Sequence, residues 1–270
     1  MATEKGIDPT AVIHPSAHVE PGAQIGAGAN VGPFCVIGAQ VVLGPQVEVK
    51  SHAIITGATE IGEGTVIFPF ATIGEVPQDL KYKGETTRLV IGKRNRIREH
   101  VTMNTGTAGG GGVTRIGDDG LFMAGAHVAH DCQIGDRVIL VNNAALAGHV
   151  VLEDDVIIGG LSGVHQFVRI GRGAMIGAVC MVTADVIPHG LVQGPRGGLD
   201  GLNLVGLKRR GADKTDITAL RASVLPFKDD QGQQNEFIAP HVTGNIRRTK
   251  ALAVDEFGHE IVRPLVLAAV

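Results

Sequence analysis

The chain has 270 residues, of which 44% are hydrophobic, and it carries a formal net charge of −3 at pH 7. That charge gives no overall basic field of the kind that nucleic-acid binding usually needs, and no window offers the roughly 18 consecutive apolar residues of a membrane-spanning helix. With no Trp, one Tyr, eight Phe and 39 Gly, the core must be built from small and aliphatic side chains, which favours thin repeating layers over a compact three-layer domain.

The first residues, "MATEKGIDPTAVIHPSA", lack a basic stretch followed by an apolar one. We therefore expect no secretory signal and a cytoplasmic location. The three cysteines include no CxxC pair, so they predict neither a disulfide framework nor a zinc ribbon.

An apolar residue recurs at every sixth position along most of the chain, from Ile13 to Ile73 and again from Ile116 to Val182. This period is neither that of an α-helix nor that of a hairpin. It predicts the short parallel strands and tight corners of a hexapeptide β-helix over residues 1–190, with one coil for roughly every 18 residues. Cys35, Cys132 and Cys180 each lie four residues after such a marker, where a small inward side chain is expected, so core packing accounts for them.

Two segments interrupt the repeat. In "EVPQDLKYKGETTR" the in-phase positions are Asp79 and Glu85, which cannot lie unpaired in an apolar interior, so a loop excursion is expected over residues 75–90. The second segment, "NTGTAGGGGVTR", is rich in glycine and shifts the register by one residue. We expect it to be a flexible excursion over residues 104–115, and it lacks the GK[ST] ending of a phosphate-binding loop.

Beyond Val186 the repeat ends, and residues 191–270 are predicted to form a short, partly helical C-terminal region. A helix is expected over about residues 213–225, beginning near Asp213 and broken by Pro226. The remainder has no sustained amphipathic period and is expected to be weakly structured or peripheral. The basic cluster "LKRRG", Lys208–Arg210, fits either a solvated helix start or a pair of arginines that binds phosphate.

The stretch "AGAHVAHDCQIG" places ionisable side chains in an otherwise small and apolar segment. Stacking of coils adds residues about 18 positions further on to the same columns. The resulting patch, on one corner and its adjacent face, would contain His127, His130, Asp131, Gly148, His149, His165 and Gln166.

Three interpretations of this patch remain open: a solvated face, a zinc site and a general base. The spacing in "HVAH" is loose for zinc, and Cys132 is expected to point inward. We favour the base, because an imidazole beside a carboxylate can accept a proton near neutral pH, with Asp131 fixing the tautomer of His130. No Ser or Cys lies in the same column, which favours direct attack by a substrate hydroxyl or amine over a covalent intermediate.

Motifs in order over about residues 10 to 221 resemble the UDP-N-acetylglucosamine O-acyltransferases that begin lipid A synthesis in Gram-negative bacteria. They are "IGEVPQDLKYKGE", "IGKRNRIREHVTMNTGT", "AHVAHDCQIGDRVILVNNAALAGHV", "IIGGLSGVHQFVRIG" and "NLVGLKRRG". The resemblance implies a left-handed parallel β-helix and a homotrimer with active sites between subunits. It also implies transfer of an (R)-3-hydroxyacyl group from acyl carrier protein to the 3-hydroxyl of UDP-N-acetylglucosamine, without metal or other cofactor.

The resemblance also implies roles for individual residues. His130 would be the general base, Asp131 its orienting partner, and Gly148 the donor of a backbone N–H to the oxyanion. Contacts to the nucleotide sugar would come from Asp79, Lys81, His127, His149, Gln166, Asn203 and Arg210, whereas His165 and Arg209 would line the site or the approach of the carrier protein. Ala178 would lie at the end of the acyl pocket, which predicts a medium to long hydroxyacyl chain.

Two regions depart from the family pattern. Where many members read "TIHRGT", this chain reads "TMNTGT", with Asn104 and Thr105 in place of a His-Arg pair. The tail beyond Ser223 departs most, because family members usually end in amphipathic helices. The alternative functions are N-acyl transfer to an amino-sugar nucleotide of the same pathway and a zinc-binding hexapeptide prism. The match through "QDLKY" and "GLKRRG" favours O-transfer.

Overall fold

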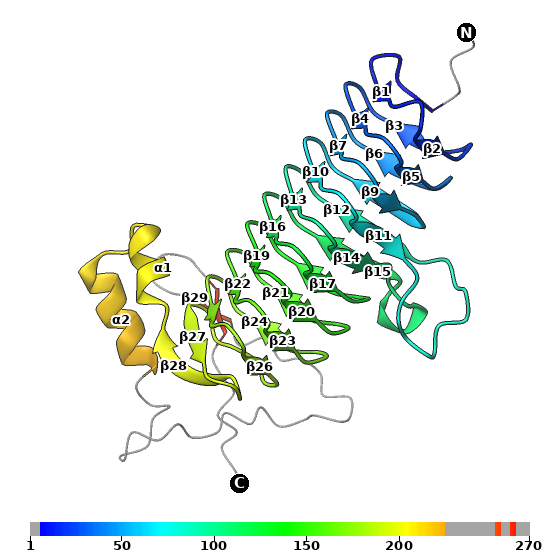
Figure 1. Cartoon of the computed structure of the whole chain (residues 1–270). Coiled ribbons are helices and arrows are strands. Elements are labelled where there is room, and N and C mark those ends of the chain that lie inside the picture. The colour runs from blue at the N-terminus through cyan, green and yellow to red at the C-terminus, as the bar shows by residue number, and fades with distance from the viewer. Residues whose placement is uncertain (1–5, 225–251, 255–259, 263–270) are drawn as a thin grey trace.

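The computed structural model describes residues 6–224, 252–254 and 260–262, and it shows three β-sheets wound into a prism (Figure 1). The predicted parallel β-helix is confirmed, since strands about one coil apart pair in parallel, with Ile13 beside Val31 and Ile37 beside Ile55. The first sheet contains β1 (Val12–Ile13), β4 (Asn30–Val31), β7 (Glu48–Val49), β10 (Val66–Ile67), β13 (Arg96–Ile97), β16 (Leu121–Phe122), β19 (Ile139–Leu140), β22 (Ile157–Ile158), β25 (Met175–Ile176), β27 (Gly190–Gln193) and β28 (Gly198–Leu202).

The other two sheets complete the prism. The second sheet contains β2 (His18–Val19), β5 (Val36–Ile37), β8 (Ile54–Ile55), β11 (Thr72–Glu75), β14 (Thr102–Asn104), β17 (His127–Val128), β20 (Ala145–Leu146), β23 (Gly163–Val164) and β26 (Met181–Val182). The third contains β3 (Gln24–Ile25), β6 (Val42–Leu43), β9 (Ala58–Ile61), β12 (Arg88–Ile91), β15 (Val113–Ile116), β18 (Gln133–Ile134), β21 (Val151–Leu152) and β24 (Arg169–Ile170).

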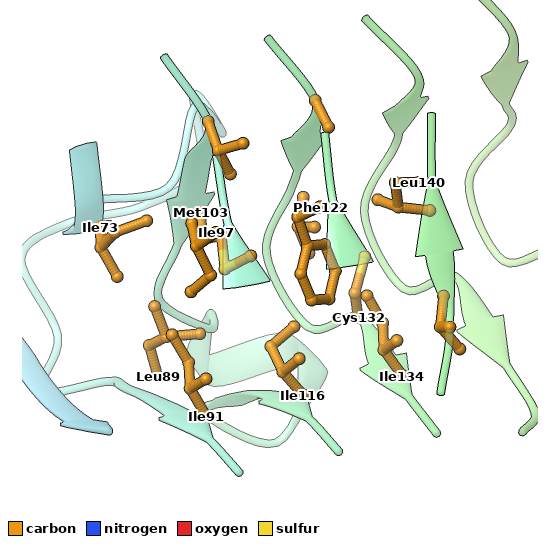
Figure 2. Close-up of a cluster of buried hydrophobic side chains, with 14 of the residues drawn as sticks. Ile73, Leu89, Ile91, Ile97, Met103, Ile116, Phe122, Cys132, Ile134 and Leu140 are labelled. Carbon is orange, nitrogen blue, oxygen red and sulfur yellow. The ribbon is translucent and has the colours of Figure 1, made fainter. Parts of the chain in front are cut away.

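The apolar markers of the sequence repeat form the core. In the two-residue strands the second residue points inward, because neighbouring side chains alternate between the faces of a strand. Figure 2 shows ten labelled members of this core: Ile73, Leu89, Ile91, Ile97, Met103, Ile116, Phe122, Cys132, Ile134 and Leu140. All three cysteines are buried and free, as the repeat predicts.

Three lines of tight turns join the sheets. We call the turns between the second and third sheets the second corner; it includes residues 129–132, 147–150 and 165–168. The third corner, between the third and first sheets, includes residues 171–174, and the first corner, between the first and second sheets, includes residues 177–180.

Both interruptions of the repeat leave the prism at the second corner (Figure 1). The first excursion covers residues 76–87 and the second, which contains the 3₁₀ helix η1 (Ala108–Gly110), covers residues 105–112. Both are shorter than the predicted ranges 75–90 and 104–115, because Arg88–Ile91 and Val113–Ile116 are strands that pair with each other along their length. The six-residue period indicates only which residues point into the core. It therefore could not show that the residues just before Ile91 and Ile116 also pair as strands.

The C-terminal region continues the prism before it becomes helical. β27 pairs in parallel with β25, and β28 turns back antiparallel to β27, so the sheet extends past Val186 and the predicted boundary at 190 falls inside β27. The helix α1 (Leu204–Arg209) was not predicted, and Lys208 and Arg209 lie in its last turn, not at a helix start. Basic side chains there complement the negative end of the helix dipole.

The helix α2 (Lys214–Val224) lies within the predicted range 213–225. Asp213 and Asp216 each accept a hydrogen bond from the other's backbone N–H, a reciprocal cap that fixes the start of the helix. Within the tail, β29 (Leu252–Val254) pairs antiparallel with β30 (Glu260–Val262), whereas Pro226 and the rest of the predicted peripheral segment lie outside the described residues. Among the described residues, none of the helices combines the length and apolar character needed to cross a bilayer.

Candidate active site

His130 and Asp131 form a buried pair at the second corner. Nδ1 of His130 lies 2.8 Å from Oδ2 of Asp131, and their side chains are only 8% and 1% exposed. An ionised carboxylate can only accept, so Nδ1 is the donor in this bond, and in the neutral imidazole this tautomer leaves the lone pair on Nε2. Asp131 has φ of 60°, a left-handed conformation that aspartate tolerates better than most residues, and this turn directs its carboxylate back toward the ring.

The second excursion holds the carboxylate of Asp131. The backbone N–H of Thr107 donates to Oδ1 at 2.8 Å, and its hydroxyl donates to Oδ2 at 2.6 Å. The backbone N–H of Asp131 donates in turn to the hydroxyl of buried Thr114 in β15. The glycine-rich composition led us to expect a flexible excursion, yet the segment packs against the prism at Thr105 and Thr107, which are buried.

Gly148 lies directly against the ring of His130. A Cβ atom at this position would lie 2.4 Å from Cε1 and 2.6 Å from Nε2 of the imidazole, closer than side-chain atoms approach one another. Only glycine therefore permits the observed position of the His130 ring. The resemblance assigns Gly148 a second role, as the donor of a backbone N–H to the oxyanion.

His149 extends the site by one coil. Its ring meets His130 edge-on at 5.0 Å and stacks on Phe167 at 4.3 Å, and its Nε2 lies 3.8 Å from Oδ2 of Asp131. Burial lowers the pKa of His149 below its ordinary 6.5, although the negative charge of Asp131 opposes the shift. The imidazole is therefore uncharged at neutral pH, and it can exchange hydrogen bonds with a substrate without adding a charge.

His127 lies beside the pair on the outer face of β17. Its Nδ1 is 2.7 Å from the hydroxyl of Thr102 on the neighbouring strand β14. Burial lowers the pKa of this imidazole, and the proximity of His130 lowers it further. His127 is thus a second neutral imidazole beside the pair of His130 and Asp131.

The first excursion brings Asp79 and Lys81 toward His149. The carboxylate of Asp79 accepts a hydrogen bond from the backbone N–H of Lys81, which stabilises the turn. The charges of both residues act on the pKa of His149, Asp79 raising it and Lys81 lowering it. His165 and Gln166, in the next turn of the second corner, are exposed. The structure thus places the predicted polar residues of three successive coils at the second corner or beside it.

Four other predicted residues lie elsewhere in the chain. Asn203 is the N-cap of α1 and also donates to the carbonyl of Gly173 at the third corner. Arg210 donates to the same carbonyl, and exposed Ala178 lies at the first corner. Arg209, at the end of α1, belongs to the same C-terminal region. None of these four, within one copy of the chain, shares the second corner with His130.

Asn104 and Thr105 are buried and join the two excursions. The backbone N–H of Thr105 and the side-chain amide of Asn104 both donate to the carbonyl of Glu75. The hydroxyl of Thr105 lies 3.0 Å from that of Thr87. The two residues that depart from the family motif therefore lie in the buried base of the excursions.

The zinc interpretation can be tested on the donor set. His130, Asp131 and His149 each offer a ligand atom, and these atoms lie within 4.8 Å of one another. Both oxygens of Asp131, however, already accept hydrogen bonds from Thr107 or His130. Oδ2, which lies 3.8 Å from Nε2 of His149, accepts two of these hydrogen bonds, so a cation bound by this oxygen would have to displace a donor. The arrangement therefore fits a histidine base better than a metal ligand set.

Thr107 and Thr114 are the functional candidates that sequence reasoning missed. Thr107 was missed because it lies in an insertion, and the insertion breaks the spacing of about 18 residues that predicts which residues stack on neighbouring coils. A signal was nevertheless present, since Met103, which precedes the excursion, belongs to the same column as Val128, which precedes His130. Counting coils across the insertion would have placed the excursion above Asp131.

Comparisons with known proteins agree on one family. A model described as "Udp N-acetylglucosamine O-acyltransferase; Domain 2" matches residues 185–228, and one described as "Bacterial transferase hexapeptide (six repeats)" matches residues 7–39. The acyl-(acyl-carrier-protein)–UDP-N-acetylglucosamine O-acyltransferase of Rhizobium johnstonii is 52% identical over 190 residues, 70% of each chain.

Two further proteins extend this similarity. The enzyme of the same name from Paracoccus denitrificans is 84% identical over 156 residues, 58% of this chain, and the match spans 60% of that relative's length. The solved structure of UDP-N-acetylglucosamine acyltransferase from Campylobacter jejuni is 42% identical, with 82% of this chain and 86% of that chain covered and a TM-score of 0.76.

Proposed function

The chain belongs to the UDP-N-acetylglucosamine O-acyltransferase family, and we propose that it transfers an (R)-3-hydroxyacyl group from acyl carrier protein to the 3-hydroxyl of UDP-N-acetylglucosamine. Its fold is the left-handed parallel β-helix of the hexapeptide transferases. The observation that carries the proposal is the buried hydrogen bond between His130 and Asp131 beside Gly148. The names of the relatives supply the substrates.

The pair supports direct acyl transfer. Nε2 of His130 accepts the proton of the sugar hydroxyl as its oxygen attacks the thioester carbonyl, and Asp131 stabilises the imidazolium that forms. The backbone N–H of Gly148 stabilises the negative oxygen of the tetrahedral intermediate. The C–S bond then breaks, and the imidazolium returns the proton to the departing sulfur, so the chain ends in its starting state.

Residues around the pair suit a nucleotide sugar. Lys81 offers a positive charge for the diphosphate, Asp79 an acceptor for sugar hydroxyls, and His127, His149 and Gln166 neutral hydrogen-bonding groups. Because Asp79 and Lys81 lie toward His149 on the same copy, one chain provides this half of the site. The cytoplasmic location and the medium to long acyl chain remain predictions from the sequence.

A homotrimer with sites between subunits would supply the remaining groups. Asn203, Arg210 and Ala178 lie at corners other than that of His130, so they can reach a substrate there only from a second copy. In that arrangement Arg209 and His165 would line the site or the approach of the carrier protein, and Ala178 would limit the acyl chain.

A turnover assay tests the function. The protein would be incubated with UDP-N-acetylglucosamine and a panel of (R)-3-hydroxyacyl carrier thioesters of different lengths, and separately with a 3-amino analogue of the sugar nucleotide. His130→Ala should lower turnover by about 100- to 10,000-fold, whereas His14→Ala, an exposed histidine in the first coils, should not. Unchanged turnover in His130→Ala would overturn the proposed base, and turnover with the amino analogue alone would indicate N-transfer.

A further inference from the structure

Thr107 uses two donors on one carboxylate. Its backbone N–H binds Oδ1 of Asp131 and its hydroxyl binds Oδ2, the same oxygen that accepts from Nδ1 of His130. The three bonds lie in a buried environment, with Thr107 only 7% exposed. Two donors from one residue fix the plane of the carboxylate, and the third direction is left for the imidazole.

The second excursion is shaped to make this contact. A Cβ atom at Gly110 would lie 2.0 Å from Cγ of Asp131, and one at Gly106 would lie 2.8 Å from Oδ1. The glycines therefore allow the backbone to pass directly over the carboxylate. Below it, the hydroxyl of Thr114 accepts from the backbone N–H of Asp131, so the residue is held from both sides.

On the basis of the proposed acyl transfer, we infer that Thr107 is a positioning residue that acts on His130 through Asp131. Charge-assisted hydrogen bonds are stronger than neutral ones, and a buried carboxylate deprived of a donor is poorly satisfied. Without the Thr107 hydroxyl, the carboxylate of Asp131 can rotate, and the imidazole that is hydrogen-bonded to it then turns as well. Nε2 of His130 no longer faces the substrate hydroxyl.

Paired substitutions test the inference. Thr107→Val removes the hydroxyl with little change of shape, and Thr107→Ser retains it. We expect Thr107→Val to lower kcat by about 10- to 100-fold with KM within about twofold, and Thr107→Ser to stay within about threefold of wild type. The matched control is Thr65→Val, because Thr65 is a buried threonine whose hydroxyl binds the carbonyl of Gly92 away from the second corner. It should keep the wild-type kcat.

A double-mutant cycle separates positioning from loss of fold. In an Asp131→Asn background the hydroxyl has no carboxylate to hold, so adding Thr107→Val should change kcat by less than about threefold. Equal losses in Thr107→Ser and Thr107→Val, or a full additional loss in the Asp131→Asn background, would overturn the inference.

A spectroscopic readout keeps the inference independent of turnover. The low-field proton resonance of His130 Nδ1–H, identified by its absence from His130→Ala, should move or disappear in Thr107→Val and persist in Thr107→Ser. If the wild type transferred no acyl group, the proposed function would fail, yet this resonance would still decide the role of Thr107. A resonance unchanged in folded Thr107→Val would overturn that role.

Discussion

Gly148→Ala is a direct test of whether the position of the His130 ring matters. The added Cβ would lie 2.4 Å from Cε1 of the ring, whereas ordinary contact begins at 3.4 Å. Gly148 is not among the described glycines with positive φ, so alanine fits the backbone and the perturbation is confined to the ring. The ring must retreat by about 1 Å, a misplacement that can cost on the order of 100-fold in rate.

Initial rates of thiol release from the hydroxyacyl carrier thioester would measure the effect, with kcat/KM expected to fall about 100-fold. Gly109→Ala is the matched control, because a Cβ at Gly109 meets nothing within 4 Å and should leave the rate unchanged. Alanine keeps the backbone N–H, so loss of the proposed oxyanion donor cannot explain a slow variant. Thermal unfolding of both variants would exclude loss of the fold.

The same substitution in a His130→Ala background provides the internal check. With no ring to displace, Gly148→Ala should then cost less than about threefold. A folded Gly148→Ala protein within about threefold of the wild-type rate would refute the reasoning, since catalysis would then tolerate a displaced ring or use another base.

Four further outcomes follow from the same geometry. Asp131→Asn should lower kcat by on the order of 100-fold or more, because the neutral amide cannot stabilise the imidazolium, and circular dichroism should show the fold retained. Burial raises the pKa of the Cys132 thiol to about 12, so N-ethylmaleimide should label this residue only after denaturation, as mass spectrometry would show. Burial lowers the pKa of His127 below its ordinary 6.5, so below that pH the unfolded chain binds a proton that the folded protein does not, and the free energy of unfolding falls on acidification. The urea midpoint of His127→Asn should therefore decrease less than that of wild type between about pH 7 and pH 5.5. Dialysis against EDTA should leave turnover unchanged, since Oδ2 of Asp131, which lies 3.8 Å from Nε2 of His149, already accepts two hydrogen bonds; inactivation that zinc reverses would contradict this.

The fold could be predicted because each six-residue repeat contains one apolar residue that points into the core. An apolar residue at every marker implies a wall of parallel strands, and the same count stacks Gly148 above His130 and His149 above Asp131. The count is silent about residues between markers. It therefore missed the pairing of Arg88 with Val113, which lengthens two strands and shortens both excursions.

The candidate site was predictable only in part, for a related reason. Periodicity brings together residues that obey the register, whereas Thr107 reaches Asp131 from an insertion that breaks it. The helix α1 escaped prediction because six residues carry too little periodicity. The places of Asn203 and Arg210 depend on packing against Gly173, which no local pattern encodes.

Two other aspartates show what the second excursion adds to the site. Asp119 and Asp155 lie at the third corner with φ of 59° and 60°, the same backbone conformation as Asp131. Their side chains are 41% and 22% exposed and pair with arginines in the manner of surface ion pairs, which contribute little stability.

Asp131 is 1% exposed, although its turn is of the same kind. The difference comes from the covering segment, because residues 105–112 replace solvent with the two donors of Thr107. A bare prism corner would leave the carboxylate hydrated and free to rotate. The insertion that interrupts the repeat therefore fixes and desolvates the aspartate that pairs with His130. In this buried environment the carboxylate stabilises an imidazolium more strongly than it would in water.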